Sequence, residues 1–408
     1  MIQLPLSIKR YLKISLLNLL VVAAIGVILR YKIAFSLPIV DQKHLLHGHS
    51  HFAFAGWISQ ALMSLMLYYL YQQNNSLDFK KYRWAVYGNL VTAYGMLISF
   101  AVEGYGAYSI LFSTLSICFG YFFAIVFWRD LNRLQLKNPV QLWFKASLLF
   151  NALSSIGAFA LAIMMGARII HQNWYLAAEY FYLHFQYNGW FFFSCMGLFS
   201  SLLINLVPHK KLYLCFYLFA GAMLPAYFLS ALWMQIPLWV YVIVIAAAIA
   251  QVIGWIIVIG VLKNHWSTLK TIFTGIGRGL LLLSAIALSI KLLLQLGSTL
   301  PAFSTLAFGF RPIVIGYLHL VLLGVISLFI LGFVFLTDTL LINRITTIGA
   351  FLFTTGIIIN EFFLMLQGIT AMSYISIPFI NLYLLAMACV MLVGIAAILI
   401  SQYKYFKK

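Results

Sequence analysis

Twelve apolar runs, each long enough to cross a bilayer as a helix, follow one another along the 408 residues of this chain. A spanning helix needs about 20 mostly apolar residues. Only 8% of the residues are charged, against about 25% in an ordinary soluble domain. The sequence therefore predicts an all-α integral membrane protein with twelve transmembrane helices. The runs are centred near Ala23, Leu62, Tyr94, Cys118, Phe159, Cys195, Phe219, Ala248, Leu288, Ile326, Gly356 and Met391.

The basic residues are divided unequally between the two ends of these runs. Of the 25 Lys and Arg residues, 19 lie on the side of the chain termini, five lie on the opposite side, and Lys291 lies inside the ninth run. The positive-inside rule then places both termini in the cytoplasm, as in a bacterial-type inner membrane. We interpret the net charge of +18 as a topology signal and a contact with anionic lipid. No nucleic-acid partner is expected.

One histidine motif occurs three times at nearly equal spacing. Its histidines are separated by 133 and then by 135 residues. Self-similarity at a fixed period is typical of internal repeats. We therefore expect a single transmembrane domain, residues 1–408, made of three pseudo-repeats of four helices at about 1–140, 141–269 and 270–408. The copies are His51-Phe-Ala-Phe-Ala-Gly56-Trp57, His184-Phe-Gln-Tyr-Asn-Gly189-Trp190 and His319-Leu-Val-Leu-Leu-Gly324-Val325.

The predicted chemistry depends on these histidines. The second, sixth and tenth helices all enter from the outer side, so their histidines are expected at similar depth. Neutral imidazole is a common ligand of haem iron, copper and zinc. Two further histidines, His47 and His49, precede His51. On a helix, His47 and His51 share a face and could bind one metal ion together, whereas His49 points about 200° away from His51 and could serve a different cofactor.

The run His49-Ser-His51-Phe-Ala-Phe-Ala-Gly56-Trp57 resembles the His-x-His-x4-Gly-Trp motif of haem-copper oxidase catalytic subunits, especially the cbb-type branch and nitric oxide reductases. Those proteins have twelve helices in three groups of four. The resemblance implies a low-spin haem b between His51 and His319, a copper ligand at His184, and oxidoreductase activity on oxygen or nitric oxide. The sequence departs from that family at Tyr317, where a histidine would hold a second haem, and in its seventh helix, which has no histidine. We assign no catalytic residue.

A second family is also similar. The NnrS membrane proteins, which are linked to nitric oxide stress, carry a His-x-His-x4-Gly motif on the second of twelve helices. This chain lacks their Trp-Thr-Gly continuation. Because the sequence has no Cys-x-x-Cys-His motif, any haem is expected to be non-covalent, and its electrons would come from a partner subunit or from quinol.

Three charged residues add candidate roles. Arg311 precedes the tenth helix, where its guanidinium could pair with a haem propionate. Glu361 and Lys291 lie inside predicted helices, where an ionisable side chain is costly and is a functional candidate by default. We predict a proton relay at one or both of them.

A transporter or channel with pseudo-threefold repeats is the alternative interpretation. Internal repeats are common in transporters, although they usually come in pairs with helices broken near the membrane midplane. Pro225 and Pro237 are the main interruptions of the apolar runs, and they have no counterparts in the other two repeats.

Overall fold

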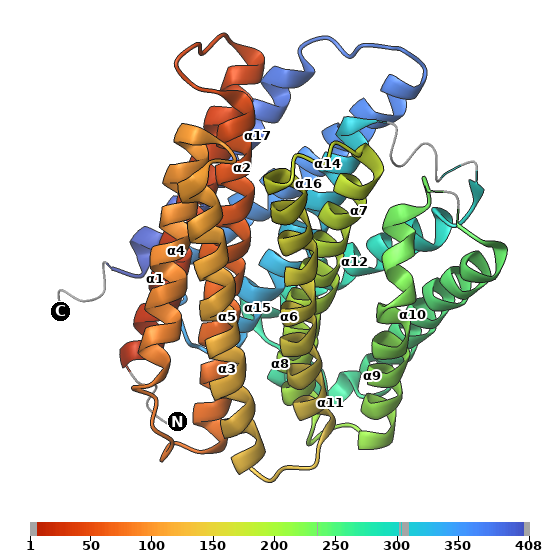
Figure 1. Ribbon diagram of the computed structural model, residues 1–408. Coiled ribbons are helices and arrows are strands. Elements are labelled where there is room, and N and C mark those ends of the chain that lie inside the picture. Colours follow the sequence, from red (N-terminus) through yellow and green to blue (C-terminus); the bar gives the residue numbers. More distant parts are fainter. Residues whose placement is uncertain (1–5, 235, 302, 304–309, 404–408) are drawn as a thin grey trace. The chain divides into compact units, whose positions relative to one another are not determined.

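The computed structural model describes residues 6–234, 236–301, 303 and 310–403, and every regular element in that part of the chain is a helix (Figure 1). Ten of the described helices are long and apolar enough to cross a membrane. The predictions of an all-α chain and of a multi-pass membrane protein are therefore confirmed. Lys404, Lys407 and Lys408, which contributed to the charge asymmetry, lie outside the described residues.

The structure does not reach the predicted number of twelve spans, although all twelve apolar runs contain helix. The seventh run is divided into α9 (His209–Met223) and η3 (Pro225–Ala231), which are bent by 49°, and counting this pair as one span gives eleven. Pro225 explains the break, because proline has no N–H and its ring clashes with the preceding turn.

The sixth run is helical over residues 172–203 but is not among the ten apolar helices. Its first half carries several polar residues, which lower its mean hydropathy. These polar residues are Gln172, Asn173, Glu179, His184, Gln186 and Asn188.

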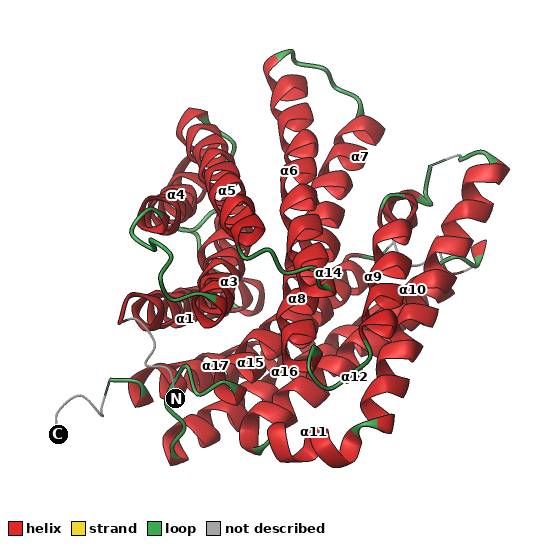
Figure 2. Ribbon diagram, turned by 90° about the horizontal axis from the view of Figure 1, so that it is seen from below, coloured by secondary structure: helices red, strands yellow, loops and turns green. Residues whose placement is uncertain are grey.

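The chain divides into two compact units, and each is described by itself. Unit 1 comprises residues 1–130, 276–281 and 327–408. Its helices α1, α3, α4 and α5 are seen nearly end-on as one group in Figure 2. The helices lying wholly or mainly in unit 1 are α1 (Leu6–Ala34), α2 (Gln42–Phe52), η1 (Ala53–Ser59), α3 (Gln60–Gln73), α4 (Tyr82–Glu103), α5 (Ala107–Arg133), α15 (Leu328–Leu336), α16 (Arg344–Met372) and α17 (Ile380–Ser401).

Unit 2 comprises residues 131–275 and 282–326. Its core includes an apolar cluster between α9, η3 and α10, in which Ala226 and Val244 are fully buried. Besides α9 and η3, the helices lying wholly or mainly in unit 2 are α6 (Pro139–Gly166), α7 (Gln172–Leu183), η2 (His184–Phe191), α8 (Phe192–Leu203), α10 (Leu238–Asn264), α11 (Trp266–Ile272), α12 (Gly275–Gly297), α14 (Arg311–His319) and η4 (Leu320–Ser327).

Glycine permits a close helix contact in unit 1, between α16 and α17. A Cβ atom added at Gly349 would lie 2.7 Å from the carbonyl oxygen of Gly394. A Cβ atom added at Gly394 would lie 2.6 Å from the backbone nitrogen of Phe353. Small residues at such contacts are typical of membrane helices, because association there depends on close backbone packing.

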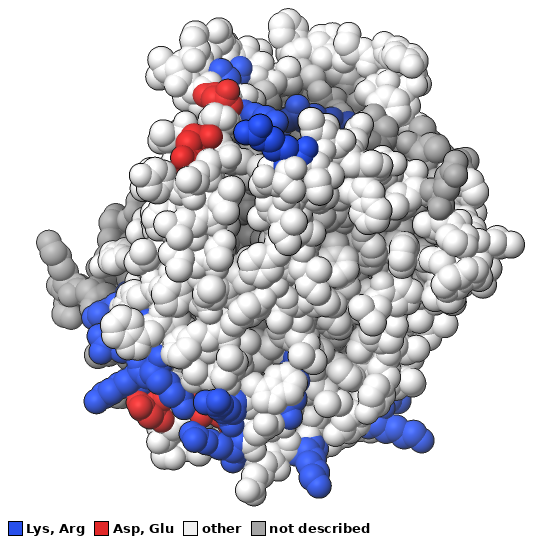
Figure 3. All heavy atoms as spheres, in the orientation of Figure 1, with Lys and Arg blue, Asp and Glu red and all other residues white. Residues whose placement is uncertain are grey.

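Charged side chains gather toward the ends of the helices and leave an uncharged face between them (Figure 3). In unit 1, one buried carboxylate shows how such an end is stabilised. Asp130, which is fully buried, forms an ion pair with Lys81 at 2.6 Å and accepts a hydrogen bond from the Tyr82 hydroxyl at 2.8 Å. These contacts compensate the loss of water around the carboxylate.

Candidate functional site: the histidine-bearing helices

Each of the three His-x4-Gly motifs lies where an α-helix changes into a π-helix. η1 begins two residues after His51, η2 begins at His184, and η4 begins directly after His319. π-Helical segments are rare and occur frequently at functional sites. The three motifs therefore share a local backbone structure, which the sequence analysis did not predict.

In unit 1, asparagine side chains hold the carbonyl groups of the π-segment η1. Asn18 of α1 donates through Nδ2 to the carbonyl oxygen of Gly56 at 2.5 Å, and its Oδ1 accepts a hydrogen bond from the Tyr94 hydroxyl at 3.0 Å. Asn89 of α4 donates to the carbonyl oxygen of Ala55 at 3.0 Å. Asn18 and Asn89 are buried. A wider helical turn is thus stabilised by side-chain donors from two neighbouring helices.

Polar side chains also hold both π-segments of unit 2. In η2, Gln186 donates through Nε2 to Asn151 Oδ1 at 2.9 Å and to Ser154 Oγ at 2.7 Å, both on α6. In η4, the carbonyl oxygen of Val325 accepts a hydrogen bond from Ser284 of α12 at 2.7 Å. Each π-segment is therefore bonded to the helix that opens its own predicted repeat.

These contact residues are themselves equally spaced, and the sequence analysis missed them. Asn18, Asn151 and Ser284 are separated by 133 residues each, which is also the spacing of the first two motif histidines. A search for isolated polar residues inside apolar runs, compared at that spacing, would have found them. Their shared role in binding a π-segment could not be predicted, because nothing in the sequence indicated the π-helices.

The histidines of α2 face two different helices. The His51 ring stacks on Phe100 of α4, with ring centroids 4.3 Å apart, and the His47 ring lies 4.7 Å from Tyr105 and also contacts Phe100. His49 lies on the other side, because a Cβ atom added at Gly26 of α1 would be 3.6 Å from His49 Cε1. The structure thus places His47 and His51 on one face of α2. Within the described residues, the buried Nε2 atom of His47 has no hydrogen-bond partner.

An aspartate cap fixes the start of this helix. Asp41 Oδ1 accepts a hydrogen bond from the backbone N–H of His44 at 2.8 Å. This bond stabilises the carboxylate and lowers the pKa of Asp41 from its ordinary value. The cap therefore satisfies one of the free N–H groups at the start of the helix that carries His47, His49 and His51.

His184, the predicted copper ligand, has both ring nitrogens bonded within unit 2. Its side chain is 0% exposed. Nε2 donates to the carbonyl oxygen of Met223 at 2.9 Å, so Nδ1 accepts the hydrogen bond from Asn188 at 3.2 Å. Met223 is the last residue of α9, just before the break at Pro225. The N–H of Tyr227, which would bond to the Met223 carbonyl oxygen in an unbroken helix, bonds to the carbonyl oxygen of Leu224 instead. The arrangement does not fit copper, because an ion at His184 would have to replace one of these bonds.

His319 is oriented differently. Its Nδ1 bonds to the carbonyl oxygen of Ile315 at 2.9 Å, which makes Nδ1 the donor and gives Nε2 the lone pair. A backbone partner of this kind fixes the tautomer and orientation of many metal-binding histidines. His319 belongs to unit 2, whereas His51 belongs to unit 1. Arg311, the candidate propionate partner, is exposed at the start of α14.

The two candidate relay residues have different surroundings. Glu361 of α16, in unit 1, accepts a hydrogen bond from Asn360 at 3.1 Å and interacts electrostatically with Arg30 of α1. Lys291 of α12, in unit 2, is 5% exposed, and its Nζ lies 6.0 Å from the ring centre of Phe192.

No group of three or more His, Cys, Asp or Glu side chains gathers as a metal site within the part of the chain that the structure describes. The predicted metal ligands His47, His51 and His184 are thus not joined there by further ligands of these types. The four cysteines, Cys118, Cys195, Cys215 and Cys389, are all free thiols.

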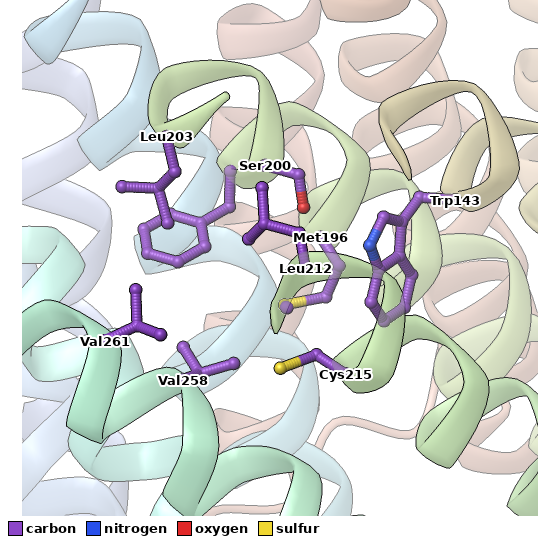
Figure 4. Close-up of a pocket in the computed structure, with 9 residues that line it drawn as sticks. Trp143, Met196, Ser200, Leu203, Leu212, Cys215, Val258 and Val261 are labelled. Atoms are coloured by element: carbon purple, nitrogen blue, oxygen red, sulfur yellow. The ribbon is translucent and has the colours of Figure 1, made fainter. Parts of the chain in front are cut away.

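A small cavity lies in unit 2 between α6, α8, α9 and α10 (Figure 4). Its volume of ≈ 10 Å³ leaves room for about one water-sized molecule. Trp143 and Cys215 are among its lining residues, and the buried Nε1 of Trp143 has no hydrogen-bond partner among the described residues. The lining is otherwise almost entirely apolar, so we assign no catalytic chemistry to it.

Comparison with models of known protein families found no match to this chain, and comparison with curated proteins found none. The resemblance to the haem-copper oxidases and to the NnrS proteins therefore depends on the motifs and on the predicted number of helices. The histidines and their surroundings are therefore the features of this chain that bear on its function.

Proposed function

We propose that this chain is a haem-binding redox protein of a bacterial-type inner membrane, with twelve spans in three four-helix repeats and both termini in the cytoplasm. Its scaffold would be related to that of the haem-copper oxidase and NnrS proteins. The observation that carries the proposal is the occurrence of a π-segment at each of the three His-x4-Gly motifs. Unrelated helices would not be expected to share the motif, the π-turn and a polar contact at nearly equal spacing.

The proposed haem is b-type and non-covalent, with His51 and His319 as axial ligands and Arg311 near a propionate. When bound, haem supplies one-electron redox chemistry. The tautomer of His319 supports the assignment, because Nδ1 is bonded to a carbonyl oxygen and Nε2 has the lone pair that iron needs. On the side of His51, the Phe100 ring fixes the imidazole plane, and the clamped π-segment η1 fixes the backbone that follows it.

The proposed activity is electron transfer, with quinol or a partner subunit as the donor, in a response to oxygen or nitric oxide. We propose no haem-copper reaction centre, because both nitrogens of His184 are bonded to protein atoms. Glu361 is the remaining proton-relay candidate of unit 1. Its carboxyl group interacts with the positive charge of Arg30.

The test is a reduced-minus-oxidised visible spectrum of the detergent-purified chain, with haem and copper quantified on the same sample. We expect a six-coordinate b-type spectrum that is lost in His51→Ala and in His319→Ala. His209→Ala is the matched control, because His209 is exposed at the start of α9. A colourless, metal-free protein after expression with ample haem and copper would exclude the redox function.

One observation favours a transporter as the second candidate. α9 and η3 form a bent pair at Pro225, and broken helices near the substrate site are typical of secondary transporters. In this chain the freed carbonyl group of Met223 is bonded by His184, which closes the break. Substrate-dependent flux in liposomes by a haem-free chain would move this candidate to first place.

A further inference from the structure

A polar stripe runs along one face of α12 in unit 2. Ser284, Lys291 and Gln295 are spaced seven and four residues apart, which places them on one side of a helix. All three are buried. The Oε1 atom of Gln295 has no hydrogen-bond partner within the described residues. The stripe therefore brings the amino group of Lys291 and an unsatisfied amide oxygen into the interior of unit 2.

Contacts with η4 place Lys291 at the level of His319. α12 and η4 run in opposite directions, since Ser284 bonds to Val325 and a Cβ atom added at Gly324 would lie 3.2 Å from the Cβ atom of Ala287. One turn beyond Ala287 is Lys291, and one turn before Gly324 is the residue that follows His319. Lys291 also interacts electrostatically with His184.

Two phenol groups belong to the same region of unit 2. Tyr187 of η2 lies near enough to Tyr317 of α14 for the charge of one phenolate to be felt by the other, and the Tyr187 hydroxyl bonds to Ser230 and Asn188. Tyr317 precedes His319 by two residues. Together with Lys291, the Tyr317 hydroxyl is a hydrogen-bond donor suited to a negative charge.

Unit 2 supplies no carboxylate partner for Lys291. Among its described residues the only acid is Glu179 of α7, and the one ion pair found in the described part of the chain, Lys81–Asp130, lies in unit 1. A buried cation without a counter-charge is costly, and inside a membrane it usually marks a functional site. The missing charge can come from a ligand.

We infer that unit 2 contains a binding site for one small monovalent anion, held by the ammonium group of Lys291 with the Tyr317 hydroxyl as a further donor. The anion would supply the counter-charge that the chain lacks at this level. Lys291 then has a binding role in place of the predicted proton relay. The inference does not depend on haem, since none of its observations involves a haem ligand as a partner of the anion.

The experiment is equilibrium dialysis of the haem-free chain in lipid nanodiscs against radioactive iodide, with gluconate keeping the ionic strength constant. A His51→Ala background removes the proposed haem ligand of unit 1, so failure of the haem proposal would leave the result unaffected. We expect one saturable iodide per chain. Lys291→Met should abolish saturable binding, whereas Lys263→Met, a change at the end of α10, should leave it intact.

Tyr317→Phe gives a second test with a smaller change. Loss of one hydrogen bond to a charged ligand should weaken iodide binding about tenfold. Helix content and gel filtration would establish that each variant folds. Absence of saturable iodide binding in the parent chain would overturn the inference, and so would unchanged affinity in folded Lys291→Met. Should Lys291→Met fail to fold, unchanged affinity in Tyr317→Phe would overturn it.

Discussion

His51 and His184 occupy the same place in two copies of one motif, yet their surroundings differ. The His51 ring stacks on an aromatic side chain, and His47 beside it on α2 has a buried nitrogen without a hydrogen-bond partner among the described residues. His184 is fully buried and has both nitrogens bonded to protein atoms. The two copies therefore share the π-helical backbone that accompanies the motif, whereas the neighbouring helices determine the contacts of each imidazole.

The reason for the difference lies in the helix that packs against each motif. At η2 the neighbouring α9 ends at Met223, just before the break at Pro225, and the Met223 carbonyl oxygen accepts a hydrogen bond from the His184 imidazole. At η1 the neighbouring α4 is unbroken and presents Phe100. His184 therefore makes two hydrogen bonds to protein atoms, whereas the contact shown for His51 is its stacking on Phe100.

The largest effect on stability is expected at His184. His184→Ala should lower the free energy of unfolding by about 3–5 kcal/mol, because it leaves two buried polar groups unsatisfied and creates a cavity. His209→Ala, an exposed change, should cost less than about 0.5 kcal/mol. Detergent unfolding followed by tryptophan fluorescence measures both. Equal stability of the two variants would contradict a structural role for His184.

A smaller effect is expected at the contacts that hold the π-segments. Asn18→Ala removes the partner of both the Gly56 carbonyl and the Tyr94 hydroxyl and should cost about 2–3 kcal/mol. Asn151→Ala should cost about 1 kcal/mol or less, because Gln186 keeps its bond to Ser154. The same unfolding assay compares them, and a larger loss in Asn151→Ala would reverse the expected order.

Alanine at the three motif glycines should destabilise the fold by different amounts, with the smallest loss at Gly324. A Cβ atom at Gly56 would lie 2.7 Å from the Phe52 ring, and one at Gly189 would lie 2.6 Å from Phe150, so each alanine should cost about 1–3 kcal/mol through overpacking. The nearest neighbour of a Cβ atom at Gly324 is 3.2 Å away, and there the cost should be under about 1 kcal/mol. Thermal unfolding of the three variants checks this order. A Gly324→Ala variant less stable than the other two would show that the η4 contact is the tighter one.

The smallest effect is expected at the Asp41 cap, and it depends on pH. Because the folded-state pKa of Asp41 is lowered, its contribution to stability is present above the unfolded-state pKa and is lost as the pH falls through the folded-state pKa, below about pH 4. Asp41→Asn keeps a capping side chain that does not titrate. The difference in unfolding temperature between the two proteins should therefore change between pH 6 and pH 3. A constant difference would exclude the carboxylate as the cause.

Much of the helical fold could be predicted from the sequence, because the length of an apolar run depends on local composition. The ten helices confirmed as membrane-length elements all coincide with predicted runs. The break at Pro225 was visible as an interruption, but its consequence for the number of spans was not. The relative hydropathy of the sixth run was overestimated because its polar residues are concentrated in one half.

The candidate site was less predictable. The sequence indicated the motif histidines, and helical geometry placed His47 and His51 on one face. It could not show that His184 would be bonded at both nitrogens, because Met223 is contributed by a different helix and only as a carbonyl group. The sequence also showed no sign that Asn18 bonds to the Gly56 carbonyl oxygen, because this contact depends on a π-turn that no residue pattern predicts.

The most direct test of the account compares haem content in three single-residue variants of the full chain. Pyridine haemochrome quantification should give the same haem content per chain for the parent and for folded His184→Gln. It should give close to no haem for His51→Ala and His319→Ala. That result would assign a haem-ligand role to His51 and His319 and a structural role to His184. Full haem retention in His51→Ala, with loss in folded His184→Gln, would contradict it.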